Sequence, residues 1–61
     1  MKDIPELFAD LTRAAEDLAD LAAEGMNREL PHILQQELLV TVNERIRGLA
    51  ETARQLALAF F

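Results

Sequence analysis

The sequence contains no cysteine, serine, tryptophan or tyrosine. The absence of cysteine excludes disulfide bonds and thiolate metal sites. The absence of cysteine and serine also removes the commonest nucleophiles of covalent catalysis. Aromatic residues make up 5% of the chain, so few side chains could stack on nucleic-acid bases. The hydrophobic core must therefore be aliphatic, and we expect a protein without enzymatic activity.

Long apolar runs and an excess of basic residues are missing as well. No stretch reaches the roughly 18 uncharged apolar residues that a membrane span requires, and the N-terminus has no apolar run of signal-peptide type. The net charge is −5, from 11 acidic and 6 basic residues. This balance disfavours nucleic acid and anionic lipid as main partners. We expect a cytoplasmic protein with no membrane segment.

The chain is short for an independent fold. Its 61 residues suit a single domain, and 51% of them are hydrophobic, so disorder is not expected. A domain of this size buries only about 60% of the surface that its unfolded chain exposes. Small domains commonly gain stability from disulfides, a metal or oligomerisation, and disulfides are excluded here.

Two helical segments are predicted, from about residue 4 to 24 and from about 31 to 60, with a linker over 25–30. Asp3 is a suitable N-cap, and Pro5 stands in the first turn, where its missing donor costs nothing. Gly25 is expected to end the first helix in a left-handed conformation. Pro31 is expected in the first turn of the second helix.

Both segments have apolar residues at heptad spacing, which predicts the broad apolar face of bundle helices rather than a narrow two-stranded seam. In the first segment the face comprises Ile4, Leu7, Leu11, Ala14, Leu18 and Leu21, widened by Phe8, Ala15 and Ala22. In the second it comprises Leu39, Val42, Ile46, Leu49, Ala53, Leu56 and Phe60, widened by Ala50 and Ala57.

The short linker predicts an antiparallel helical hairpin. If Glu24 lies opposite Pro31, Asp10 lies near Arg45, and the second helix passes the start of the first after about residue 51. Its last turns would then project alone, although they are apolar. A second copy would cover them, giving an all-α hairpin that self-associates into a four-helix bundle. This architecture is like that of ROP-type proteins by analogy only, because no sequence motif is shared.

The predicted interface follows from this alignment. It consists of the apolar side chains of the last turns and two further apolar residues displaced from the main stripe of the second helix: Leu56, Leu58, Phe60 and Phe61, with Ile33 and Val40. Acidic residues flank the stripe of the first helix, and we expect Asp10, Asp17 and Arg45 to help fix orientation through ion pairs.

Site chemistry is sparse. Glu29 and His32 have E-x-x-H spacing, which in di-iron bundles places a carboxylate and an imidazole on one helix face. Pro31 lies between them and is expected to mark the helix start, which would leave Glu29 in the linker. No glycine-rich phosphate loop is present. We therefore predict no catalytic residues, no metal ligands and no cofactor.

The sequence favours a small non-enzymatic interaction or regulatory module that forms homodimers through an apolar helical face. Two alternatives remain. A dimeric bundle that gathered arginines on one face would suit a nucleic-acid-binding regulator. A hairpin whose apolar stripe met a different chain would suit a heteromeric adaptor, a secretion chaperone or an antitoxin-like partner.

Overall fold

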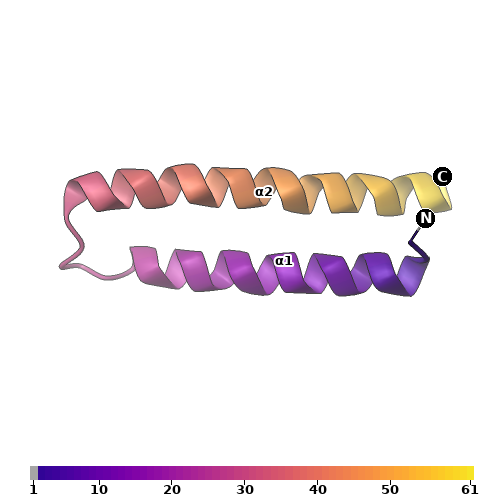
Figure 1. Ribbon diagram of the computed structural model, residues 1–61, viewed down its shortest axis with the longest axis horizontal. Coiled ribbons are helices and arrows are strands. Elements are labelled where there is room, and N and C mark those ends of the chain that lie inside the picture. Colours follow the sequence, from indigo (N-terminus) through magenta and orange to yellow (C-terminus); the bar gives the residue numbers. More distant parts are fainter. Residues whose placement is uncertain (1) are drawn as a thin grey trace.

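The computed structural model describes residues 2–61, and these form two α-helices joined by a loop. Helix α1 spans Ile4–Gly25 and helix α2 spans His32–Phe60. The helices lie side by side and antiparallel, so the start of α1 and the end of α2 share one end of the molecule (Figure 1). No strand occurs within residues 2–61. The predicted all-helical hairpin is confirmed.

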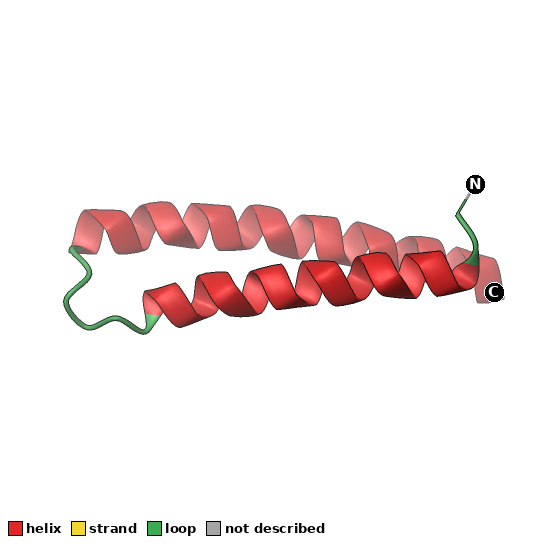
Figure 2. Cartoon of the chain, turned by 60° about the horizontal axis from the view of Figure 1, so that its bottom comes forward, coloured by secondary structure: helices red, strands yellow, loops and turns green. Residues whose placement is uncertain are grey.

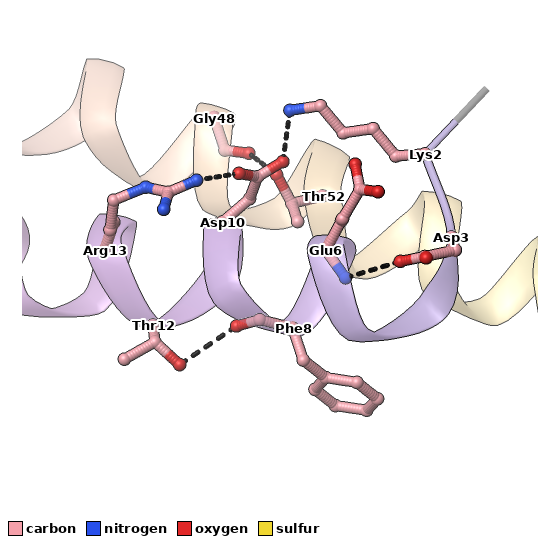
Figure 3. Close-up of polar contacts among 9 residues, drawn as sticks. All are labelled: Lys2, Asp3, Glu6, Phe8, Asp10, Thr12, Arg13, Gly48 and Thr52. Carbon is pink, nitrogen blue, oxygen red and sulfur yellow. Dashed lines mark hydrogen bonds and ion pairs between the residues drawn. The ribbon is translucent and has the colours of Figure 1, made fainter.

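The start of α1 is fixed by its capping residue. The Asp3 carboxylate accepts a hydrogen bond of 2.9 Å from the backbone N–H of Glu6. Pro5 lies within the first turn, where no intrahelical donor is needed. Figure 3 shows this cap at the end of α1, close to the side chain of Lys2.

The end of α1 differs from the prediction. Gly25 is the last helical residue, and no glycine in residues 2–61 has a positive φ angle. Met26 instead closes the helix in a right-handed conformation, and its N–H and that of Asn27 donate to the last carbonyls of the helix. Because the cap is right-handed, the chain does not reverse direction at Gly25. It continues outward before it turns.

The loop is built on Asn27 and Pro31. The Asn27 side chain accepts a hydrogen bond of 3.0 Å from the N–H of Glu29, and the Asn27 carbonyl accepts one of 3.1 Å from Leu30. Pro31 is extended and precedes the helix as its N-cap residue, without a side-chain cap bond. Helix α2 therefore begins at His32, and Figure 2 shows the loop extending beyond the end of α1.

The two helices differ in length, but the surplus of α2 lies at the loop end. α1 has 22 residues and α2 has 29, so they are about 33 and 43 Å long at 1.5 Å per residue. The longest dimension of the molecule is 44 Å, so α1 lies almost entirely within the span of α2. Figure 1 shows that the first turns of α2 extend past the end of α1.

Side-chain contacts fix this register. Arg45 Nε lies 2.8 Å from Asp17 Oδ2, and a Cβ atom on Gly25 would lie 3.4 Å from Leu38 Cδ2. Gly25 is thus level with Leu38 and not with the start of α2. The predicted alignment was wrong by about two helical turns, because it assumed that the chain reverses immediately after α1. No long C-terminal overhang exists.

Candidate interaction surface

The helices meet along an inner seam of heptad-spaced residues. On α1 these are Ile4, Leu7, Leu11, Ala14, Leu18 and Leu21, and on α2 they are Leu38, Val42, Arg45, Leu49, Thr52 and Leu56. Leu7 and Leu56 are the buried residues of the described chain, 7% and 6% exposed. The other members are half-buried, except for Arg45, which is exposed. Two helices alone cannot enclose a core, so even the inner seam stays partly open.

A second heptad series follows the inner seam by one residue on both helices, and we call it the outer seam. On α1 it comprises Phe8, Thr12, Ala15, Ala19, Ala22 and Met26, and on α2 Leu39, Asn43, Ile46, Ala50, Ala53, Ala57 and Phe60. No member is charged, and all are exposed. The large members are between 44% exposed, at Ile46, and 79% exposed, at Met26.

The outer seams of the two helices lie on the same side of the hairpin. At about 100° per residue, each outer seam is rotated by about 90° from its inner seam. On each helix the outer-seam residue follows the inner-seam residue in the chain direction. Because the two helices run in opposite directions, this one-residue rotation brings both outer seams to the same side of the plane that contains the two helix axes. Phe8 and Ile46 therefore belong to one continuous uncharged surface, which we call the apolar side.

The opposite side of the hairpin carries ion pairs. Asp10 pairs with Lys2 and Arg13, and Asp17 pairs with Arg45 of α2. Figure 3 shows Asp10, Lys2 and Arg13 gathered on one edge of α1, whereas Phe8 points away from the opposite edge. We call the edge with these pairs the polar side. The hairpin thus has one charged side and one uncharged side.

The ion pairs of the hairpin shift the pKa values of the groups that form them. The hydrogen bond from Lys2 is the largest influence on Asp10 and holds its pKa below the ordinary 3.8, with Arg13 adding to the effect. Elsewhere on α2, the hydrogen bond from Arg54 lowers the pKa of Glu51, and Glu51 in turn raises the pKa of Arg54. Arg13, Arg45 and Arg54 all have carboxylate partners within the chain.

The exposed area of the hairpin is large for its size. The accessible surface is 4924 Å², whereas a compact folded monomer of this length exposes about 4,000 Å². The radius of gyration is 14.2 Å, against about 10–11 Å for a compact chain. The excess, about 900 Å², is close to the roughly 800 Å² that each partner buries in a standard interface.

The residues predicted as an interface do not form one patch. Leu56 is buried against α1 and is not available to a partner in this hairpin, which corrects its expected position in an overhang. Leu58 and Ile33 are exposed, and Leu58 borders a pocket together with Lys2, Leu7 and Asp10. Phe60 is a member of the outer seam. Val40 and Phe61 each follow an outer-seam residue and border that surface.

The predicted orientation residues occupy the polar side. Asp17 and Arg45 form the pair between the helices, whereas Asp10 pairs with Lys2 and Arg13 and not with Arg45. Sequence reasoning missed the outer seam as a separate surface. Phe8, Leu39 and Ile46 were assigned to one broad core face, although their uninterrupted uncharged heptad spacing was a usable signal.

The E-x-x-H segment does not assemble a ligand set. Glu29 lies in the loop, and His32 is the first residue of α2, with its Nε2 atom 3.3 Å from Gln36 Nε2. Within residues 2–61 no three His, Asp or Glu residues are grouped so as to hold a metal ion. In the same residues, neither helix has both the length and the apolar character needed to cross a membrane.

Comparisons with known proteins add no assignment. No protein-family model matches the chain, and no curated protein or solved structure is significantly similar to it. The outer seam therefore has to be interpreted from its own chemistry.

Proposed function

We propose that this protein is a small non-enzymatic interaction module that acts through its apolar side and associates first with a second copy of itself. The observation that carries the proposal is the outer seam, an uncharged heptad series on both helices that the hairpin leaves uncovered. Apolar residues scattered singly on a surface are ordinary, but a contiguous apolar patch along a whole face is typical of an interaction site.

The geometry of the two seams supports a four-helix bundle. Each helix of such a bundle contacts two neighbours that lie about a quarter turn apart around its axis. The inner and outer seams of each helix are separated by about 90°. The inner seam is used within the hairpin, so the outer seam is positioned for a helix of a second hairpin.

The arginines do not favour nucleic acid as the partner. Three of them pair with carboxylates of the same chain, and the net charge is −5. Phosphate recognition depends on clustered, uncompensated Lys and Arg residues. We accordingly place protein association, and not nucleic-acid binding, at the centre of the proposal.

Sedimentation equilibrium of the full chain over a wide concentration range tests this function, with helicity followed by circular dichroism. We expect a reversible, defined dimer whose helicity falls when dilution dissociates it. A poorly defined aggregating species that becomes monodisperse only with a different protein would favour the heteromeric adaptor. A helical monomer at every concentration would overturn the proposal of self-association.

A further inference from the structure

We infer that the second copy binds with its loop at the same end of the bundle, so that α1 packs against the partner's α2 and Glu16 pairs with Arg47 of the partner subunit. This inference rests on the proposed self-association. It adds the orientation of the two hairpins, which the apolar side alone leaves open.

Two symmetric arrangements would cover the apolar side. If the two-fold axis runs parallel to the helices, the loops lie together and each α1 faces the partner's α2. If the axis runs across the helices, the loops lie at opposite ends, and each helix faces its own counterpart. In both arrangements large side chains of one outer seam could meet alanines of the other. Packing alone therefore does not distinguish the two arrangements.

The charges beside the outer seam do separate the two arrangements. One residue after every second outer-seam position lies an edge residue, rotated further outward and placed like one of the flanking positions of a coiled coil. These edge residues follow Phe8, Ala15 and Ala22 on α1 and Leu39, Ile46, Ala53 and Phe60 on α2. On α1 the edge residues are Ala9, Glu16 and Ala23, and on α2 they are Val40, Arg47, Arg54 and Phe61.

The observed register brings these edges into correspondence. Gly25 is level with Leu38. Because the helices are antiparallel, each residue earlier in α1 is level with a residue correspondingly later in α2. Glu16 is then level with Arg47, and Ala23 with Val40. When the loops lie together, the edge of α1 runs along the edge of the partner's α2, so that Glu16 meets the partner's Arg47 and Ala23 meets the partner's Val40. Ala9 is level with Arg54, which pairs with Glu51 within its own chain.

The opposite arrangement has the reverse effect. There the edge of α2 faces the partner's α2 edge, which brings Arg47 close to the partner's Arg47. The edge of α1 faces its own counterpart, which brings Glu16 close to the partner's Glu16. Like charges at flanking positions disfavour a pairing.

The charge pattern within the chain agrees with this assignment. Glu16 and Arg47 are both exposed, and neither takes part in an ion pair among residues 2–61. The other arginines of the two helices are already paired with carboxylates of the same chain. Arg47 is therefore the helical arginine left for a partner, and two-fold symmetry would form the pair twice in each dimer.

Charge reversal tests the pairing. Glu16→Arg alone and Arg47→Glu alone should each raise the dimer Kd about tenfold, because each change places like charges together at two symmetric positions. The double variant should return to within about threefold of the original Kd. Glu44→Arg and Arg28→Glu make the same changes in net charge away from the apolar side and should leave the Kd nearly unchanged.

Cysteine cross-linking tests the orientation independently, since the chain has no cysteine of its own. Ala15→Cys and Ala50→Cys chains, mixed and oxidised, should form a mixed disulfide, whereas Ala15→Cys alone should not cross-link with itself. Self-linking of Ala15→Cys, or a dimer that the double reversal fails to rescue, would overturn the loops-together orientation while leaving self-association intact. A chain that stays monomeric would instead overturn the proposed function.

Discussion

The inner and outer seams have the same spacing and adjacent positions, yet only one of them is covered. Leu7 and Leu56 of the inner seam are 7% and 6% exposed, whereas Phe8, one residue later, is 49% exposed. The difference does not lie only in the kind of side chain, because leucine, isoleucine, alanine and threonine occur in both seams. It also lies in which seam has a neighbour within the chain.

This comparison shows how little of the fold is completed by the hairpin itself. Fully burying a large apolar side chain contributes roughly 1.5–3 kcal/mol, and among residues 2–61 only Leu7 and Leu56 are buried. A second helix pair placed on the outer seam would enclose the inner seam as well, since both seams would then face the centre of one bundle. Folding and association are therefore expected to be coupled.

The largest effect is expected from Leu56→Ala in the inner seam. Truncation of a buried leucine destabilises a protein by about 2–5 kcal/mol, which is enough to unfold a hairpin with so small a core. Leu58→Ala on the same helix is the matched control, because Leu58 is 67% exposed. Its free energy of unfolding should change by about 0.5 kcal/mol or less. Urea denaturation followed by circular dichroism measures the free energy of unfolding of both variants. Equal losses of stability would contradict the assignment of Leu56 to the buried inner seam.

The next largest effect is expected from Ile46→Glu in the outer seam. In an isolated hairpin this exposed substitution would be almost neutral, but in a dimer it would place a charge in an apolar contact. We expect the dimer Kd to rise by about a hundredfold or more. Ile33→Glu is the matched control, since Ile33 is similarly exposed but lies outside the outer seam. If Ile33→Glu weakened association more than Ile46→Glu, the interface would have to include Ile33 and lie outside the outer seam.

Much of the fold could be predicted from local signals in the sequence. The Asp3 cap, the break near Gly25 and the heptad spacing locate two helices, and a short connection between helices makes them antiparallel. These are properties of residues close together in sequence, and each acts without knowledge of the partner helix. The helix boundaries in the structure, Ile4–Gly25 and His32–Phe60, depend on these same signals.

The register could not be predicted in the same way, because it depends on a loop conformation. Gly25 has the freedom to reverse the chain in a left-handed cap, yet it remains in helical geometry and Met26 closes the helix. This conformation at the end of α1 shifts α2 along α1 relative to the predicted alignment. Leu56 therefore lies in the core and not in the expected overhang. The same shift replaces the expected neighbour of Arg45, so that Asp17 and not Asp10 forms the pair.

Gly48→Ala tests the polar side, where no partner helix is expected. Gly48 precedes Leu49 of the inner seam, opposite to the outer seam, and its carbonyl accepts a hydrogen bond from the Thr52 hydroxyl (Figure 3). A Cβ atom added to Gly48 would meet nothing within 4 Å. Alanine is favoured over glycine in a helix interior by about 1 kcal/mol, so the free energy of unfolding should rise by up to that amount at every protein concentration. Gly25→Ala should give a smaller gain, because it ends α1 and its Cβ would contact Leu38. A weakened dimer in Gly48→Ala would reveal a helix packed on the polar side.

The smallest effect is expected from titrating the polar side. The folded chain holds the pKa of Asp10 below 3.8, chiefly through the hydrogen bond from Lys2. A depressed carboxyl pKa contributes stability that is present above the unfolded value and is lost as the pH falls through the folded pKa. The stability advantage of the original chain over Asp10→Asn should therefore be present at pH 6 and should shrink below about pH 4.

Solvent screening limits the size of this effect, because the Asp10 ion pairs are solvent-exposed. Urea denaturation of both chains at fixed ionic strength measures it, with Asp20→Asn as a control for the loss of one negative charge. An advantage that stayed constant down to pH 3 would show that Asp10 contributes through its shape and not through its charge. The dimer Kd of Asp10→Asn should be unchanged at pH 6, since in the proposed dimer the contact is made by the outer seam, which contains no ionisable group.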